Sequence, residues 1–390
     1  MIEYLMATDE QREYAELARE IVEKELRPKL TEYEDADGGL GEYPWEVHKK
    51  LVEAGFYSMN MPAEWGGLEF DNVTRGLILE QISHVDCGFA FSFRGLGDKF
   101  NIIIDSHIPE EDKHDWIDKM IAGEAGGGFC LTEPEAGSDS KAIRTTAVKD
   151  GDEWVINGSK CFITNGPISN FYGVFAWTDK SVSAGHGITC FLVERDRPGV
   201  SVSGHERKMG FKLSPTSSVY FDDVRVPEDH IVGELGRGFS TAMGTLDVAR
   251  PFNSVFAIGA AQQAVDVAVK YANERKTFGK KIIEHQAIAF ELADLQMKVD
   301  AARAMTYYTL AAADKGIKLG RLASEAKAFP TELCQQVAID AIQILGGYGY
   351  MRDYPLEKIM RDLRLFTIFA GTNEIQRMII SRSMIDKSRN

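Results

Sequence analysis

The sequence predicts an α+β protein in three parts: a helical domain (1–122), an antiparallel β-domain (123–238) and a helical bundle (239–390). Apolar residues recur at helical spacing towards both ends of the chain, and short runs rich in β-branched and aromatic residues fill the middle. A chain of 390 residues is also too long for one ordinary hydrophobic core. Two or three separately packed domains are therefore expected.

The first domain is predicted from segments such as "QREYAELAREIVEKELRPKL", where Tyr14, Leu17, Ala18 and Ile21 follow the helical repeat and charged residues occupy the other face. The segment "NVTRGLILEQISHV" continues in the same manner. We therefore expect a layer of amphipathic helices.

The pattern changes near Gly123. Segments such as "EWVINGSKCFITNG" and "GITCFLVERD" are short, β-branched and aromatic, and they are separated by Asn-Gly, Asp-Gly and Pro-Gly turn signals. Strands this short and this closely spaced predict an antiparallel sheet or a barrel-like domain.

Helical spacing returns after Phe239, in longer stretches. "FAIGAAQQAVDVAVKYANER" and "RLASEAKAFPTELCQQVAIDAIQIL" carry broad apolar stripes that are typical of helices packed in a bundle.

Charge and cysteine content narrow the function classes. With 44 Lys and Arg against 59 Asp and Glu, the net charge is −15, which argues against nucleic acid or an anionic membrane as the main partner. Five scattered cysteines without a CxxC pair indicate reduced thiols, with no disulfide framework and no metal site. The N-terminal segment resembles neither a signal nor a transit peptide, and no apolar run reaches membrane-spanning length. The expected location is the cytoplasm.

Four motifs have both a structural and a ligand-binding interpretation. "FCLTEPEAGSDS" (129–140) is either a surface turn or a loop that binds a flat polar ring or a phosphate. In "NGSKCFITNG", Phe162 and Thr164 fall on one strand face, which either packs or meets a ligand. "ERKTFGK" (274–280) is a basic cluster suited to a pyrophosphate or to a helix C-terminus. "QILGGYGYMRD" (343–353) is either a glycine cap or a backbone that approaches a cofactor.

Together, and in this order, "TEPEAGSD", "NGSKCFITNG", "ERKTFGKKIIEHQ", "QILGGYGY" and "GTNEIQR" resemble the acyl-CoA dehydrogenase family, and the resemblance covers essentially the whole chain. It implies an N-terminal α-helical domain, a middle β-domain and a C-terminal four-helix bundle. It also implies FAD as cofactor, a CoA thioester as substrate, a homotetramer in which each FAD site takes residues from a neighbouring subunit, and an electron-transferring flavoprotein as electron acceptor.

The same resemblance assigns site residues. Those implied for FAD are Phe129, Leu131, Thr132, Ser138, Phe162, Thr164, Arg275, Thr277, Phe278, Gln286, Gln343, Gly346, Gly347, Thr372 and Glu374. Those implied for the CoA portion of the substrate are Ser138, Asp247, Arg250, Gly371 and Arg382.

The chain departs from the family at the catalytic base. Members remove an α-proton from the thioester with a glutamate, a contribution of roughly a hundred- to ten-thousand-fold in rate. That glutamate lies either before the Gly-Thr of "AGTNEIQR", here Ala370, or before the arginine of "LDVARPF", here Ala249. Alanine cannot accept a proton, so a base must come from elsewhere or the chemistry must differ.

A second departure lies in "VDCGFAFSFRGLGDKFN" (85–101), which in the family forms the far wall of the acyl pocket. Helical spacing places Phe91, Arg94 and Asp98 on one stripe, which either faces inward or carries an exposed i,i+4 ion pair. Three hypotheses follow. Asp98, or the adjacent Lys99, replaces the base, as in dehydrogenases of cyclohexene-carboxyl-CoA thioesters; Arg94 holds a sulfinate, as in the 3-sulfinopropionyl-CoA desulfinases; or the chain is a catalytically silent flavin-binding subunit. We favour the first, with Asp98 and Arg94 as candidate catalytic residues.

Overall fold

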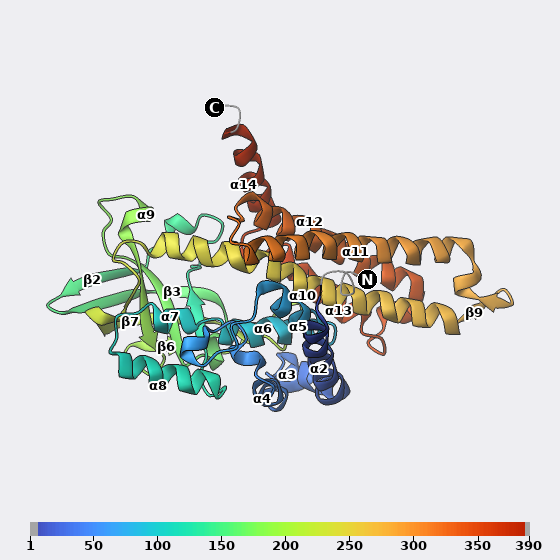
Figure 1. Ribbon diagram of the computed structural model, residues 1–390, viewed down its shortest axis with the longest axis horizontal. Helices are drawn as coiled ribbons and strands as arrows, with labels where there is room; N and C mark the ends of the chain where they lie inside the picture. Colours follow the sequence, from blue (N-terminus) through green and yellow to red (C-terminus); the bar gives the residue numbers. More distant parts are fainter. Residues whose placement is uncertain (1–6, 387–390) are drawn as a thin grey trace.

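The computed structural model describes residues 7–386, and its three regions follow one another along the chain (Figure 1). The sheet lies at one end of the long axis, and the bundle extends to the other end, where the β9 hairpin projects (Figure 1). Within the described residues, no helix has both the length and the apolar character needed to cross a membrane.

The N-terminal region is helical because its apolar stripes are combined with good helix starts. Thr8 and Gln11 form a capping box at the first helix, and Asp86 accepts a hydrogen bond from the Phe89 backbone N–H at 2.6 Å at the start of α6. The helices are α2 (Asp9–Glu25), α3 (Leu30–Gly39), α4 (Trp45–Glu53), α5 (Asn72–Ser83), α6 (Cys87–Gly97), α7 (Phe100–Ile104) and α8 (Glu110–Ile121).

The middle region is a sheet in the order β6-β7-β3-β2-β4-β5-β8, with β1 added beside β4. Its strands are β1 (Gly127–Cys130), β2 (Thr146–Asp150), β3 (Glu153–Thr164), β4 (Phe171–Trp177), β5 (Ile188–Glu194), β6 (Val200–Val202), β7 (Thr216–Pro227) and β8 (Ile231–Val232), with the short α9 (Ala184–Gly187) before β5.

Most neighbouring strands in this sheet are antiparallel, as predicted, but β4 pairs in parallel with both β1 and β2. The chain returns to the side of β1 only after completing the β2–β3 hairpin, so this crossover has no local turn signal. The prediction of a purely antiparallel sheet was wrong at these two pairings.

The C-terminal region is a four-helix bundle of α10 (Gly238–Glu274), α11 (Gln286–Asp314), α12 (Arg321–Leu345) and α13 (Leu356–Phe366). A hairpin of β9 (Lys276–Thr277) and β10 (Lys280–Lys281) joins α10 to α11, and α14 (Asn373–Asp386) projects from the body (Figure 1). The long α10 also packs against α5 and α6, so it links the helical regions.

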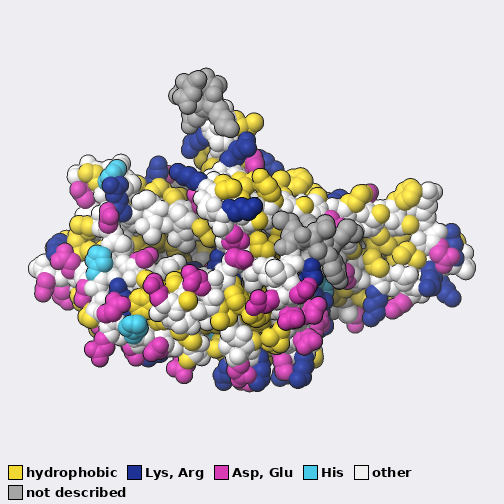
Figure 2. All heavy atoms as spheres, in the orientation of Figure 1, with side chains coloured by type: hydrophobic (Ala, Val, Ile, Leu, Met, Phe, Trp, Pro, Cys, Tyr) yellow, Lys and Arg dark blue, Asp and Glu magenta, His cyan; other side chains and the backbone are white. Residues whose placement is uncertain are grey.

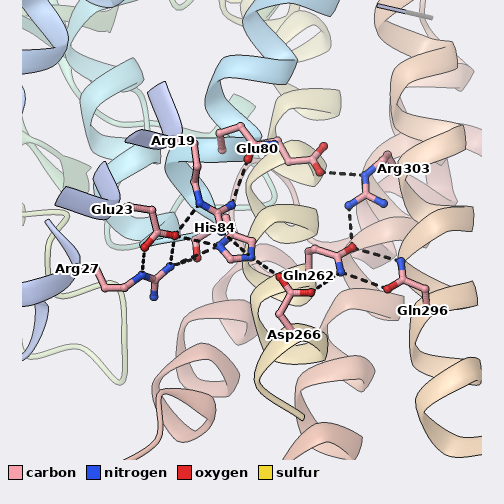
Figure 3. Close-up of polar contacts among 10 residues, drawn as sticks. Arg19, Glu23, Arg27, Glu80, His84, Gln262, Asp266, Gln296 and Arg303 are labelled. Atoms are coloured by element: carbon pink, nitrogen blue, oxygen red, sulfur yellow. Dashed lines mark hydrogen bonds and ion pairs between the residues drawn. The ribbon is translucent and has the colours of Figure 1, made fainter. Parts of the chain in front are cut away.

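A polar network fixes α5 between α2 and the bundle (Figure 3). Nε2 of His84, at the end of α5, lies 2.8 Å from Asp266 of α10, and 3.4 Å from a guanidinium nitrogen of Arg19 on α2. Arg303 of α11 donates to Glu80 of α5 at 2.9 Å. Since α6 begins four residues after α5 ends, these contacts also determine where α6 lies.

A buried ion triad fixes the other side of α6. Lys358 of α13 donates to the carboxylate of Asp86, the residue that caps α6, and to Asp362 at 2.5 Å. Asp362 in turn accepts from the Phe211 backbone N–H of the sheet region at 2.5 Å. This triad therefore holds all three regions together beside α6.

Candidate active site

The turn between α13 and α14 presents the residue that takes the place of the usual base. Ala370 and Gly371 both have left-handed backbones, with φ of 53° and 84°. Gln376 donates from Nε2 to the Gly371 carbonyl at 2.9 Å, and Lys327 of α12 donates to the same carbonyl at 2.9 Å. The turn is thus held from two sides, with the Ala370 methyl group at the position where the family places a carboxylate.

Lys327 is fully buried behind this turn. Its Nζ also donates to Asn373 Oδ1 at 2.8 Å, and among the described residues none of its hydrogen-bond acceptors is charged. Burial, together with the nearby positive charge of Arg250, lowers the pKa of Lys327 to about 7. The surroundings of the turn are therefore electropositive.

The second alanine lies on α10, next to Arg250. Arg250 is buried and forms an ion pair with Asp247, and its Nε is a buried donor with no hydrogen-bond partner within residues 7–386. Burial lowers the pKa of Arg250. Asp247 and Arg250, both predicted for the CoA portion, are thus brought together, while Ala249 between them carries no polar group.

Helix α6 lies beside the Ala370 turn and against α10, the helix that carries Ala249. Phe91 packs on Phe369, the residue before Ala370, with ring centroids 4.9 Å apart. One turn further along α6, the Arg94 guanidinium carbon lies 4.2 Å from the centroid of the Phe252 ring. Phe252 follows Ala249 by three residues on α10, so the face of α6 predicted to point inward does so.

Arg94 and Asp98 form the i,i+4 ion pair that the spacing predicted, at 2.7 Å. Their side chains are only 11% and 15% exposed, so the interpretation as an exposed surface pair was wrong. The cause is tertiary, because α10 covers this face of α6. Lys99, the alternative to Asp98, has its pKa lowered to about 8 by burial, against the opposing effect of Asp98.

A first group of predicted FAD residues lies at the junction of β1 and β3. The Cys161 backbone N–H donates to the Thr132 carbonyl at 3.0 Å, which holds the "TEPEAGSD" loop against β3. Phe162 has a left-handed backbone and is 70% exposed, beside buried Cys161 and Ile163. Members of this group are Phe129, Leu131, Thr132, Phe162 and Thr164, with Ser138 exposed in the loop.

A second group surrounds a pocket of about 490 Å³ at the distal end of the bundle. Arg275 and Thr277 line it with Gly346 and Gly347, and a Cβ added to either glycine would meet open space. Phe278, at the hairpin tip, is 97% exposed. Gln286 and Gln343 are exposed at the neighbouring helix ends.

The two groups lie towards opposite ends of the long axis, with β3 in the sheet region and β9 at the tip of the bundle (Figure 1). One chain therefore does not bring them together around a single ligand. The residues at the distal pocket nevertheless suit part of FAD, because a guanidinium and two side-chain-free backbone positions can hold a pyrophosphate. The exposed aromatic ring at β3 suits the flat flavin.

The remaining predicted residues lie at the start of α14 or along it. Thr372 Oγ1 accepts from the Ile375 backbone N–H at 3.3 Å and caps this helix, and Glu374 is exposed in its first turn. Arg382 is exposed towards the C-terminal end of α14, which projects from the body (Figure 1).

Two side chains of the site were missed by the sequence analysis. Lys327 lies in the helical segment "SEAKAFP", and Arg75 lies in "VTRGLILE". A cation on the buried face of an amphipathic helix was the available signal. Arg75 of α5 lies 5.2 Å from the Phe252 centroid, on the same ring that Arg94 contacts.

Comparison with known proteins identifies relatives along the full chain. Residues 8–124, 128–224 and 236–385 match the family descriptions "Acyl-CoA dehydrogenase, N-terminal domain", "middle domain" and "C-terminal domain". The probable acyl-CoA dehydrogenase FadE25 of Mycobacterium tuberculosis is 40% identical over 97% of this chain and 96% of its own length.

Solved structures agree. Butyryl-CoA dehydrogenase from Megasphaera elsdenii superposes with a TM-score of 0.91 at 36% identity, covering 97% of this chain and 98% of that one. A chain from the structure of the electron transferring flavoprotein of Acidaminococcus fermentans gives a TM-score of 0.91 at 38% identity, with the same coverage of both chains.

Proposed function

The chain belongs to the acyl-CoA dehydrogenase family and is an FAD-dependent oxidoreductase that acts on the CH–CH bond of an acyl-CoA, and we propose that its catalytic base is Asp98. We further propose that the acyl group is a non-standard one, cyclic or polar-tailed, as in dehydrogenases of cyclohexene-carboxyl-CoA. The observation that carries both proposals is the buried Arg94–Asp98 pair at the end of α6, a helix that packs on Phe369 beside Ala370 and on Phe252 of α10.

Two properties of Asp98 support its role as the base: its carboxylate group and its position at the end of α6. Among the residues of α6 and its C-cap that follow Phe91, it alone carries a carboxylate, and α6 packs directly on the Ala370 turn. A carboxylate can accept the α-proton of the thioester, and FAD, when bound, would supply the hydride-accepting chemistry. Arg250 and Asp247 would hold the CoA portion, so that the thioester lies beside the turn.

A polar or compact acyl group is favoured because charge lines this wall. A fatty tail would leave Arg94 and Asp98 buried against hydrocarbon, which costs free energy unless the pair is fully hydrogen-bonded. The same buried Arg94 supports a second candidate, a 3-sulfinopropionyl-CoA desulfinase-like reaction in which an arginine holds the sulfinate. A catalytically silent flavin-binding subunit is the third.

We also propose a homotetramer in which a second subunit completes each FAD site. The separation of the two FAD groups supports this, as does the exposed Phe278. Hydrophobic side chains gather along the bundle surface in Figure 2, and α11 exposes Phe290, Met297 and Tyr308, spaced by seven and eleven residues on one helical face. These large exposed apolar side chains favour coverage by another copy.

The proposed electron acceptor is an electron-transferring flavoprotein, supported by the similar chain in the structure named for such a protein. The proposed location is the cytoplasm. All five cysteines are buried free thiols, which fits a reducing compartment.

The test is an anaerobic titration of the oxidised, FAD-loaded protein with linear, cyclic, dicarboxylic and sulfinate-tailed acyl-CoA thioesters, following flavin absorbance. We expect bleaching with a cyclic or polar tail, and a loss of roughly a hundred- to ten-thousand-fold in bleaching rate in Asp98→Asn. Asp112→Asn, an exposed aspartate on α8, is the matched control and should leave the rate unchanged.

Other outcomes separate the alternatives. Near-wild-type bleaching by Asp98→Asn would exclude Asp98 as the base. Sulfite release from a sulfinate-tailed thioester without bleaching would favour the desulfinase-like reaction. Binding of every thioester with neither bleaching nor sulfite would leave the silent subunit.

A further inference from the structure

Three cations lie near Asp98 at and after the end of α6. They are Arg75 of α5, Arg94 of α6 and Lys99, and Asp71 and Asp314 also act on Arg75. Burial lowers the pKa of all three cations, so their positive charges are poorly hydrated. Charges of this kind are stable only when they are paired, and among the described contacts only Arg94 of the three forms an ion pair, with Asp98.

Among the described contacts, the Arg75 side chain has no charged hydrogen-bond acceptor. It donates from Nη2 to the neutral amide oxygen of Asn72 at 2.5 Å, and its Nε is a buried donor without a hydrogen-bond partner in the part of the chain that the structure describes. Asp71 and Asp314 act on it only electrostatically, without an ion pair among the described contacts. An unused N–H of a planar guanidinium is the group that a second carboxylate oxygen would take.

The guanidinium groups of Arg75 and Arg94 both lie close to the ring of Phe252. Their guanidinium carbons lie 5.2 Å and 4.2 Å from the centroid of the Phe252 ring. Phe252 is on the turn of α10 that also carries Ala249 and Arg250, beside the proposed thioester position. Two guanidinium groups are thus gathered at the wall that an acyl tail would reach.

Resting on the proposed function, we propose that the substrate's acyl group ends in a carboxylate, which binds to Arg75 and Arg94. This anion would compete with Asp98 for Arg94. Once the substrate carboxylate takes the guanidinium of Arg94, Asp98 is released from its ion pair. The correct substrate therefore creates the base, and an uncharged tail leaves Asp98 held by Arg94.

The inference is tested by binding, with CoA thioethers that cannot be oxidised. A series with increasing tail length is made in matched pairs, one ending in a carboxylate and the other in its methyl ester. Calorimetric titration into the FAD-loaded protein should show the carboxylate bound about ten- to a hundred-fold more tightly at one tail length, as expected for a charge-assisted hydrogen bond. Equal affinity within every pair would overturn the proposal, and this comparison needs no variant.

Variants then assign the preference to residues. Arg75→Gln should reduce the preference for the carboxylate at least several-fold, whereas Arg321→Gln, at a half-exposed arginine on α12, should preserve it. Asp98→Asn should bind the carboxylate analogue more tightly than the wild type does, because a competing anion is removed. Weaker binding by Asp98→Asn would contradict competition for Arg94.

Different experimental outcomes would contradict the proposal that Asp98 is the base and the proposal that the acyl group ends in a carboxylate. If carboxylate and ester bind equally and Asp98→Asn still abolishes bleaching, the base proposal stands and the carboxylate inference falls. If the carboxylate is preferred and no thioester bleaches the flavin, the anion site stands and the dehydrogenation by Asp98 falls.

Discussion

The ring of Phe91 on α6 packs against the ring of Phe369, with centroids 4.9 Å apart, and Phe369 immediately precedes Ala370. The helix that ends at Asp98 is therefore seated on the turn where the sequence resemblance implies a base. The Lys358 triad and the His84 network both fix the N-terminal end of α6. A base moved from the turn to α6 would thus still lie on the same rigid assembly.

Restoring a glutamate at the turn should restore a base. In an Asp98→Asn background, Ala370→Glu should raise the rate of flavin bleaching by linear acyl-CoA about a hundred-fold. The backbone φ of 53° is already adopted by a residue with a Cβ, so glutamate adds little backbone strain. Stopped-flow absorbance measures the rate. Ala370→Gln in the same background is the isosteric control, and equal rates for Glu and Gln would show that the turn does not face the reacting carbon.

The hairpin tip should matter for assembly and not for folding. Phe278 is 97% exposed, so Phe278→Asp should leave the melting temperature of the separated chain unchanged. It should reduce both the FAD retained after gel filtration and the assembled mass determined by light scattering, because a charge would be buried against the neighbouring subunit. Val148→Asp, on the exposed face of β2, serves as the control. Unchanged mass and unchanged FAD content would remove Phe278 from the subunit contact.

His48 should make the protein acid-sensitive. It is 1% exposed among the rings of Tyr43, Tyr57 and Phe93, with Nε2 donating to the Gly123 carbonyl and Nδ1 accepting from the Tyr43 hydroxyl. Burial lowers its pKa to about 4.

The unfolded chain binds the His48 proton near pH 6.5, and the folded chain binds it only near pH 4, so stability is lost as the pH falls through this interval. The loss is about 3 kcal/mol in the free energy of unfolding. Urea unfolding at pH 7 and at pH 4 should show that His48→Gln loses this component. His107→Gln, at an exposed histidine, should keep it. An identical pH dependence in His48→Gln and the wild type would contradict the assignment.

Removing the cation of the buried triad should be costly. The side chains of Asp86 and Asp362 are 1% and 2% exposed, and Lys358 forms an ion pair with each of them. Lys358→Met should lower the free energy of unfolding by about 3–5 kcal/mol, because two carboxylates remain buried without a counter-ion. Denaturant unfolding measures the change, with Lys49→Met, at an exposed lysine, as the control. A loss below about 1 kcal/mol would show that the carboxylates are hydrated or protonated at little cost.

Local sequence patterns predicted the helices and strands, but they did not predict which of these elements pair with one another. The segment 11–30 covers most of α2 and the segment 72–85 contains α5, because their apolar repeats and capping residues are local. The parallel pairing of β1 with β4 was not predictable in this way, since the two strands are separated by a hairpin and no turn marks their contact.

The same limit applies to the site. The spacing of Arg94 and Asp98 predicted their pairing, but their burial depends on Phe252, more than 150 positions later in the chain. Arg75 and Lys327 looked like ordinary charges on amphipathic helices. Tertiary packing buries Lys327 completely and buries the Nε of Arg75. Tertiary contacts determine which charged side chains line a site. These contacts cannot be read from a single sequence.

The burial of all five thiols has a practical consequence. Maleimide reagents should leave the folded wild-type chain largely unlabelled, so one cysteine introduced at the exposed position 278 would carry a spin label or fluorophore alone. Pairs of such labels would then report distances between hairpin tips across an assembly, with the native cysteines left in place. The native cysteines therefore do not have to be removed before the quaternary structure is studied with such labels.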